Sequence, residues 1–133
     1  MVSVDVPLDI EDDVRQAIGT FIDKDVLVPP LPAVLPLPCI EVEASGGLIH
    51  NHIEKCEISL TSRADEEATA MELMLSAIGF LNTACRLQTT NLRAAIVSAL
   101  PSWVEDTARP DLATCVARLT VIAHAKTKEL DNA

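Results

Sequence analysis

Aromatic side chains are scarce in this chain of 133 residues: Phe21, Phe80 and Trp103 make up 2% of it, and tyrosine is absent. Proteins that bind single-stranded nucleic acid stack bases on aromatic rings, so the composition argues against that class. Basic residues are also few, with 10 Lys and Arg against 20 Asp and Glu and a formal net charge of −10. Because so acidic a surface repels phosphate backbones and anionic lipid, we expect no tight binding to DNA, RNA or membrane.

Targeting and disulfide signals are missing as well. The first residues, MVSVDVPLDIEDD, lack the basic start and apolar core of a signal peptide. The four cysteines, Cys39, Cys56, Cys85 and Cys115, are widely spaced and form no CxxC. We therefore expect reduced thiols in a cytosolic setting. No run of the sequence approaches the roughly 20 apolar residues that a membrane span needs.

Aliphatic residues are abundant: the apolar fraction is 49%, supplied mostly by Ala, Val, Leu and Ile. A chain of this length and composition fits a single domain over 1–133 with its own core. The order of the expected elements predicts an α+β fold, in which a small mixed or antiparallel sheet of about three to five strands packs against two or three helices.

The first third of the chain predicts a helix and a rigid connector. After a short apolar entry, Asp9 caps a helix over 9–23, whose acidic first turn suits the positive helix end. Five prolines then mark 29–38 as an extended connector, because proline removes backbone donors and fixes φ. We expect the connector to pack its apolar side chains onto the domain, namely Leu31, Val34, Leu35 and Leu37.

The sheet and helix core is expected over 38–125 and begins with a hairpin. From Pro38, Ile40, Val42 and Ala44 alternate with a solvated acidic face formed by Glu41 and Glu43. Gly46 and Gly47 are expected to break this strand, and a second strand near 52–61 directs Cys56, Ile58 and Leu60 to the core. An antiparallel pairing through a long connection is the economical arrangement.

The second half predicts a long helix and a final central strand. Ser62 and Asp65 suggest a capping box for a helix that ends near 82–83, with an apolar stripe of Met71, Met74, Leu75, Ile78 and Leu81. A short helix from Asn91 to Pro101 follows, with a strand as the alternative, and then a loop over 102–111. The last strand spans 115–125 and is central because both of its faces are apolar. Residues 126–133 form a polar tail.

Several residues invite a chemical interpretation, and each also has a structural one. Cys39, His50, His52 and Cys56 are zinc-ligand types without a recurrent ligand spacing. A cysteine could pair with a histidine as nucleophile and base, but no local signature surrounds either residue. The carboxylates Glu41 and Glu43, and those of 65–67, already suit a strand face and a helix start. We therefore expect no catalytic residue, no cofactor and no metal.

A resemblance to a known family carries the functional expectation. The residues that carry it are the segments PCIEVEASGG (38–47), EISLTSRA (57–64) and RLTVI (118–122), together with the alanine-rich helix between them. In this order they resemble the tail terminator and tail-completion, or head–tail joining, proteins of long-tailed bacteriophages. The likeness spans about residues 8 to 125. The cysteines and the dense proline run are not part of the family pattern.

The resemblance implies a structural virion protein and not an enzyme. Such a protein is made in the host cytoplasm and forms a homo-oligomeric ring, usually a hexamer, in the neck of the virion. Its partners would be the tail tube protein and the head–tail connector proteins, and DNA would pass through the lumen without specific binding. Acidic faces such as Glu41/Glu43 or Glu54/Glu57 are candidates to line that lumen.

Two further expectations concern contacts and alternatives. The residues expected to meet neighbouring subunits are Gly46, Gly47, Leu48, His50, His52 and Trp103. The alternatives are a small cytosolic enzyme that uses a cysteine or carboxylate, and a monomeric adaptor that binds a partner through the proline-rich segment.

Overall fold

The sequence folds into a five-stranded sheet, a separate two-stranded ribbon and two helices. The computed structural model describes residues 2–22, 25–88 and 90–130. The elements in chain order are β1 (Val2–Val6), α1 (Ile10–Gly19), β2 (Asp25–Leu27), β3 (Cys39–His50), β4 (Ile53–Ala64), α2 (Glu67–Leu87), β5 (Leu92–Val104), β6 (Ala113–His124) and β7 (Lys126–Leu130). The larger sheet has the order β2-β3-β4-β6-β5, and β1 pairs with β7. The predicted α+β class is confirmed.

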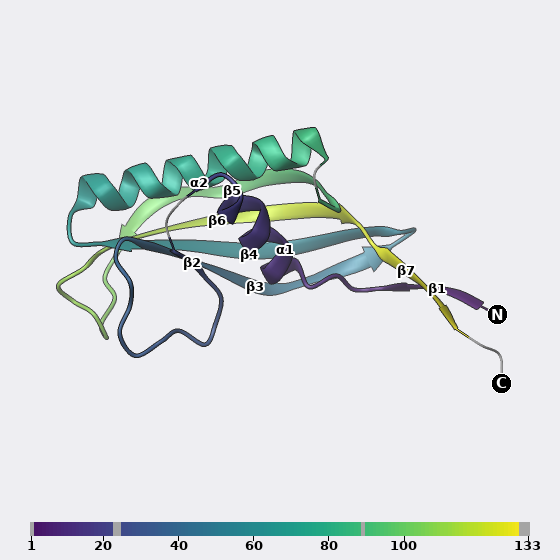
Figure 1. The fold of residues 1–133 in the computed structure, drawn as a ribbon, viewed down its shortest axis with the longest axis horizontal. Helices are drawn as coiled ribbons and strands as arrows, with labels where there is room; N and C mark the ends of the chain where they lie inside the picture. The colour runs from purple at the N-terminus through teal and green to yellow at the C-terminus, as the bar shows by residue number, and fades with distance from the viewer. Residues whose placement is uncertain (1, 23–24, 89, 131–133) are drawn as a thin grey trace.

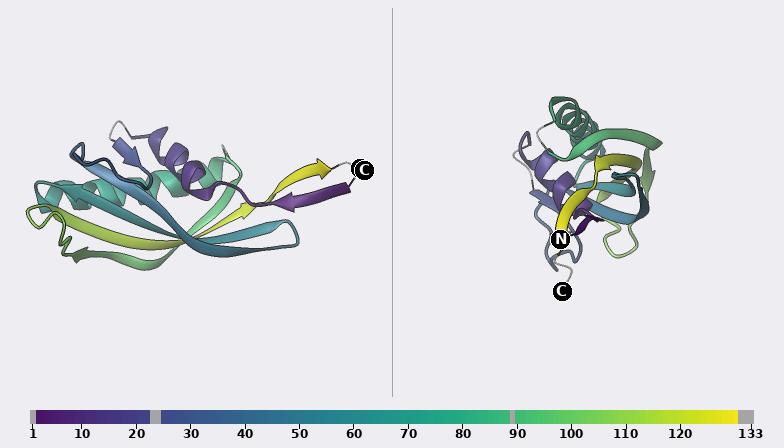
Figure 2. Two further views of the ribbon diagram at one scale, coloured as in Figure 1. Left: turned by 90° about the horizontal axis from the view of Figure 1, so that it is seen from below. Right: turned by 90° about the vertical axis from the view of Figure 1, so that its right-hand side faces the viewer.

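The two helices lie on one face of the larger sheet and leave the opposite face without helical cover (Figure 1, Figure 2). α2 runs along the sheet and contacts β4, β5 and β6, while α1 packs beside it against β2 and β3. The sheet is mixed, because β2 is parallel to β3 and every other pair in it is antiparallel. One layer of helices on one sheet face is enough to enclose a core.

The core lies between the helices and the sheet, and strand alternation selects its residues. Every second residue of β4 and β6 points to the helices, including the predicted Cys56, Ile58 and Leu60. The other large, fully buried side chains include Val14, Ile18, Ile40, Val42, Met74, Leu81, Leu92, Leu119 and Val121. The prediction that the last strand is central is confirmed, since β6 lies between β4 and β5.

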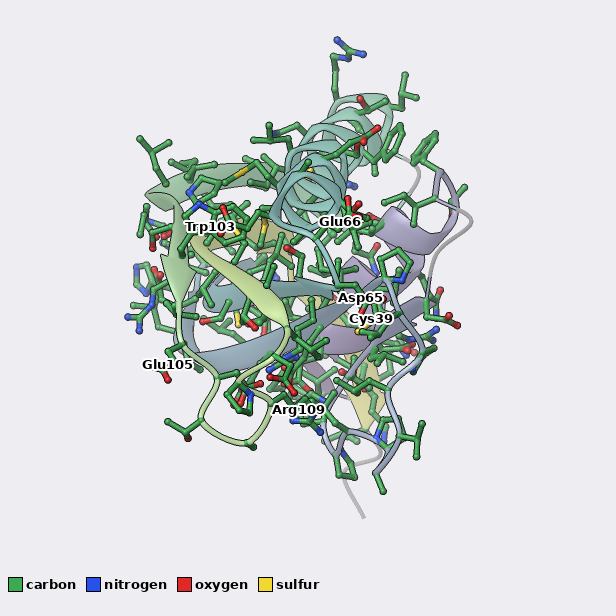
Figure 3. All side chains as sticks on the ribbon, turned by 90° about the vertical axis from the view of Figure 1, so that its left-hand side faces the viewer. Cys39, Asp65, Glu66, Trp103, Glu105 and Arg109 are labelled. Carbon is green, nitrogen blue, oxygen red and sulfur yellow. The ribbon has the colours of Figure 1, made fainter. Side chains whose placement is uncertain are left out.

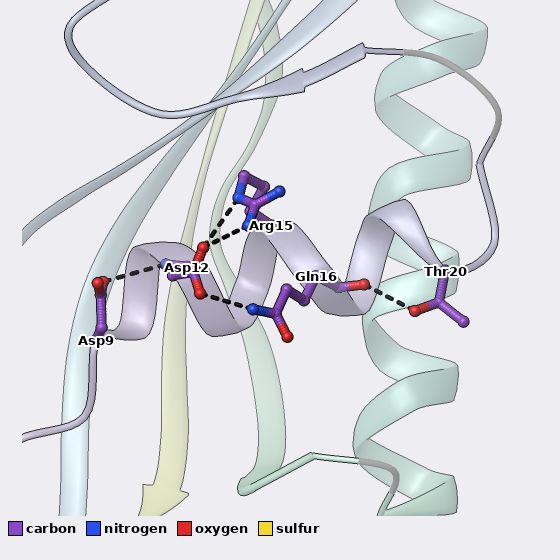
Figure 4. A network of polar contacts seen from close by, with 5 residues as sticks. All are labelled: Asp9, Asp12, Arg15, Gln16 and Thr20. Atoms are coloured by element: carbon purple, nitrogen blue, oxygen red, sulfur yellow. Dashed lines mark hydrogen bonds and ion pairs between the residues drawn. The ribbon is translucent and has the colours of Figure 1, made fainter.

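α1 begins as the sequence predicts and ends earlier. The Asp9 carboxylate accepts a hydrogen bond from the Asp12 backbone N–H at 3.2 Å, and Asp12 in turn accepts from Arg15 and Gln16 (Figure 4). The helix ends at Gly19, where the Thr20 hydroxyl donates to the Gln16 carbonyl oxygen. The prediction extended the helix to residue 23, which lies outside the described residues.

α2 begins and ends later in the chain than predicted and presents a different face to the sheet. It begins at Glu67 rather than at Ser62, which is buried in β4 and donates to the Ala70 carbonyl oxygen. It ends at Leu87, where Gln88 adopts a left-handed conformation with φ 55°. Leu75, predicted to be buried, is 57% exposed. The buried face consists of Ala70, Leu73, Met74, Ala77, Leu81, Ala84 and Cys85.

α2 also meets the length and composition of a membrane-spanning helix, which the sequence analysis did not anticipate. This is weak evidence for a membrane location, because the core helix of a layered domain meets the same criterion. Its buried face lies on the sheet, which accounts for part of its apolar character, while Leu75 and Leu87 are each 57% exposed.

The β3–β4 hairpin is antiparallel as predicted, but it is tighter and more regular. Gly46 and Gly47 do not break β3, which continues to His50, and a bulge between Ala44 and Gly46 absorbs the irregularity. The hairpin then turns over two residues, Asn51 and His52, both with positive φ. This is the turn that best matches the twist of paired strands.

The segment 92–104 is a strand, so the predicted short helix is wrong and the alternative is right. β5 pairs with β6 along its length and includes both Pro101 and Trp103, which the prediction placed at a helix end and in a loop. Register shifts occur at three places between Leu92 and Ser102. Proline is tolerated here because β5 is at the edge of the sheet.

Three segments of the fold were not predicted as they appear. β2 adds a short parallel strand before the proline-rich segment, and β1 and β7 replace the apolar entry and part of the polar tail. Residues 29–38 contain no helix or strand, as predicted. Only part of that connector packs as expected, because Val34 is 86% exposed and Leu37 is exposed as well.

Candidate functional site

Five of the six predicted contact residues come together at the far end of the β3–β4 hairpin. Gly46, Gly47, Leu48 and His50 lie on the outer half of β3, and His52 lies in the turn. A Cβ atom on Gly47 would lie 2.0 Å from the Lys55 carbonyl oxygen, so glycine is required there by the close approach of β4. The glycines therefore shape the hairpin and place no reactive group.

The β1–β7 ribbon lies next to this hairpin turn and extends beyond the sheet (Figure 1, Figure 2). An imidazole nitrogen of His52 contacts the Asp5 carboxylate, and the Ala125 N–H donates to the His52 carbonyl oxygen at 2.8 Å. The ribbon pairs Val2 with Leu130 at one end and Val6 with Lys126 at the other. The ribbon was not predicted from the sequence, because its five-residue strands are too short to show a convincing alternation.

Trp103 does not join this group. It lies on β5 opposite Cys115, which pairs with Ser62, so it belongs to the other end of the sheet. It is 44% exposed and shares the edge strand with exposed apolar neighbours, namely Ile96, Leu100 and Val104. The predicted contact residues therefore form two separate regions.

Backbone pairing with a neighbouring sheet is poorly supported at either sheet edge. The three register shifts and Pro101 interrupt the free edge of β5. At the other edge, the Ala44 N–H donates to the Glu11 carboxylate at 2.7 Å, and β2 covers the start of β3. Bulges, proline and covered amides are features that suppress edge-to-edge association. The sheet edges are therefore poor candidates for a contact surface, and the exposed side-chain surfaces are better ones.

An open cavity of about 540 Å³ lies between the hairpin and the start of α1. Its polar lining includes Glu11, Glu54 and Cys56. Both carboxylates accept a hydrogen bond from the backbone: Glu11 accepts from the Ala44 N–H, and Glu54 accepts from the Leu8 N–H at 3.2 Å. This arrangement fastens α1 and its approach to the sheet and provides no free acid–base pair.

The thiols are poorly suited to nucleophilic chemistry. Burial raises the pKa of Cys56, and the neighbouring Glu54 and Glu57 raise it further, against a lowering by a backbone hydrogen bond from Gly46. Burial also raises the pKa of Cys39, Cys85 and Cys115. Because the thiolate is the reactive form, a raised pKa means a less reactive cysteine at neutral pH.

The residues of the zinc hypothesis do not converge. Cys39 begins β3 and His50 ends it, which separates them by roughly 35 Å at the usual rise per residue. Within residues 2–22, 25–88 and 90–130, no three His, Cys, Asp or Glu side chains are grouped as metal ligands.

Alkylation of the thiols tests the enzyme alternative. In the native protein at pH 7, we expect iodoacetamide to modify all four cysteines at least about tenfold more slowly than in denaturant, because burial limits access and disfavours the thiolate. Mass spectrometry of the modified protein counts the adducts. Rapid modification of Cys56 alone in the native state would contradict this expectation and favour the enzyme.

The two predicted acidic pairs are placed differently on the sheet, because Glu41 and Glu43 share its helix-free face whereas Glu54 and Glu57 lie on opposite faces. Glu41 is buried and paired with Arg63 at 2.9 Å, whereas Glu43 is exposed. Glu54 is buried on the helix side, whereas Glu57 is exposed and accepts from the Thr120 hydroxyl on the opposite face. Neither pair forms the solvated acidic face predicted from the sequence. The buried member of each pair, Glu41 or Glu54, already accepts a hydrogen bond within the fold.

The most strongly coupled charges surround Arg63. Its Nη1 donates to Glu41, and its Nε donates to the Asp106 carboxylate at 3.0 Å. Burial alone would raise the pKa of Asp106, but hydrogen bonds from Arg63 and the Ala108 N–H, with the charges of Arg63 and Arg109, lower it overall. The network ties the β5–β6 loop to the sheet and leaves no group free for catalysis.

A second surface feature, not predicted from the sequence, lies at the start of α2. Two adjoining cavities of about 510 and 240 Å³ share Pro38 and Thr69. We call them together the α2 groove and define it by Phe21, Leu37, Pro38, Glu66, Glu72 and Phe80. The Phe21 and Phe80 rings stack within it with their centroids 5.4 Å apart.

In sequence comparisons, no protein-family model and no curated protein matches this chain.

Proposed function

We propose that this chain is a structural virion protein of a long-tailed bacteriophage, which forms a ring that terminates the tail tube and joins it to the head connector. The observation that carries the proposal lies at one end of the molecule. There the hairpin turn and the β1–β7 ribbon extend beyond the enclosed core (Figure 2). A two-stranded ribbon is marginally stable by itself in water, so such an element is expected to gain from a partner.

The order of elements supports the same proposal. A first helix, a long hairpin, a long helix and a long strand near the C-terminus follow one another in the order on which the resemblance rests. By that resemblance the ring is a hexamer in the virion neck, assembled after synthesis in the host cytoplasm, with the tube and connector proteins as partners. The net charge of −10 suits a ring through which DNA passes without binding.

The other candidate with support is a monomeric adaptor. The high exposure of Val34 would let the proline-rich segment meet a partner. Such an adaptor has no need of the ribbon or of self-association, so oligomeric state separates the two proposals.

Native mass spectrometry of the full chain tests the ring. We expect a closed oligomer with a single dominant mass, six times the 14.3 kDa of the chain for a hexamer. The same species should sediment as one boundary at several protein concentrations. A chain that stays monomeric at high micromolar concentration would contradict the ring and favour the adaptor.

A further inference from the structure

We propose that the β1–β7 ribbon of one copy docks into the α2 groove of a second copy, so that neighbouring copies associate head to tail. The inference rests on the proposed function because it identifies the contact that would build the ring. Three observations support it: the two faces of the ribbon differ in composition, the groove is complementary to one of them, and the two surfaces lie far apart within one chain.

The ribbon has one apolar and basic face. In the antiparallel register, Val2, Val4 and Val6 lie opposite Leu130, Lys128 and Lys126, and these six residues share a face. The other face carries Ser3, Asp5, Thr127 and Glu129. At the end of the ribbon Val2 and Leu130 are 42% and 44% exposed, and Lys126 and Lys128 are exposed as well. An apolar face that carries Lys128 at its centre and Lys126 at one end is suited to an apolar surface with acidic residues beside it.

The α2 groove has that composition. The apolar residues that line it include Phe21, Phe80 and Pro38, and the residues Phe21 and Leu37 remain 38% and 39% exposed. Its acidic residues, Asp65, Glu66 and Glu72, are exposed. Figure 3 looks onto this end of the molecule, where Asp65 is labelled beside Cys39, the first residue of β3, and Glu66 is labelled at the start of α2. The acidic residues of the groove complement the lysines of the ribbon, and its apolar residues complement the valines.

The ribbon cannot reach the groove of its own chain. The ribbon meets His52, just beyond the end of β3, whereas the groove contains Pro38, just before its start. The length of β3 separates the two surfaces by roughly 35 Å. A contact between two different surfaces of identical copies is heterologous, and such contacts close into a ring when the rotation between copies allows it.

Charge reversal in the full chain tests this contact. The ribbon variant carries Lys126→Glu and Lys128→Glu, and the groove variant carries Glu66→Lys and Glu72→Lys. In sedimentation velocity at low salt, we expect each variant to weaken self-association at least roughly tenfold, because like charges then face one another. The variant with all four changes should recover association, since the two surfaces are again complementary.

The matched control reverses two exposed charges on the helix-free face of the sheet, with Lys55→Glu and Arg118→Glu. It should associate as the wild type does, and thermal unfolding should show that every variant is folded. If the wild type associates and the ribbon variant associates equally well, or if the four changes together fail to restore association, the docking proposal is wrong while the ring stands. A wild-type chain that stays monomeric contradicts both.

Discussion

Replacing Arg63 with methionine is expected to lower the free energy of unfolding by about 3–5 kcal/mol. The side chains of Arg63, Glu41 and Asp106 are only 11%, 11% and 14% exposed, and the guanidinium bridges the two carboxylates. Methionine keeps much of the aliphatic volume and removes the charge, which leaves two carboxylates largely screened from water without a cation. A loss of this size is a large part of the stability of a small domain.

Equilibrium urea unfolding at pH 7 measures this effect, and two comparisons isolate its cause. Arg15→Met breaks an exposed pair with Asp12 and should cost less than about 1 kcal/mol. Adding Glu41→Gln and Asp106→Asn to Arg63→Met should recover part of the loss, because the unpaired charges are gone. A single variant that is as stable as the wild type would show that the network contributes nothing.

The same network predicts a dependence on pH. The pKa of Asp106 is lower in the folded protein than its ordinary value of 3.8. Its ionised form therefore stabilises the fold above that value, and this contribution is lost as the pH falls through the lowered pKa. The difference in stability between the wild type and Arg63→Met should accordingly shrink as the pH falls below about 4. A difference that grows in acid would have the wrong sign for this carboxylate.

Truncation of Leu81 to alanine is expected to cost about 2–5 kcal/mol, while the same change at Leu75 costs less than about 1 kcal/mol. Both residues lie on α2, but Leu81 is fully buried against the sheet and Leu75 is 57% exposed. The buried site loses contacts on all sides and leaves a cavity, whereas water already surrounds much of the exposed one. Alanine is also a good helix former, so the helix itself is not weakened at either position.

Urea unfolding of the two variants under identical conditions makes this comparison, and each serves as the control for the other. Equal losses would mean that α2 is rotated relative to the arrangement described above. The apolar stripe that the sequence suggested contains both residues, and it therefore predicts those equal losses.

The difference between the predicted and observed faces of α2 has a physical cause. The prediction followed the largest apolar residues, and it therefore included Leu75. The observed buried face uses Ala70, Ala77 and Ala84, whose small side chains let the helix lie close to the sheet. Size alone does not identify a buried face when close approach is what the packing requires.

The misassigned strand β5 shows a second limit of sequence patterns. Leu92, Ala95, Ile96, Ala99 and Leu100 have the spacing of a helical stripe, and alanine favours helices. The register shifts in β5 insert extra residues and so destroy the alternation that would reveal a strand. By contrast, β6 has no register shift against β4, so its pattern identified the strand, and the apolar residues on both of its faces identified its central position.

The candidate site could be predicted only in part. The hairpin residues from Gly46 to His52 were grouped correctly because they are close in sequence, while Trp103 was assigned to the same contact region although it lies at the other end of the sheet. The ribbon and the α2 groove escaped prediction because each combines segments that are distant in the chain, such as Phe21 with Phe80. Local periodicity contains no information about such pairings.

The pairing of β1 with β7 also constrains the order of folding. The β3–β4 hairpin closes over a two-residue turn and needs no distant partner, whereas the ribbon joins segments separated by nearly all of the described chain. Because closing a longer loop costs more entropy, the ribbon is expected to form late, after the hairpin and helices have drawn its strands together. The surface that would recruit the next copy is then absent from partly folded chains, so the proposed self-assembly would be restricted to chains whose folding is complete.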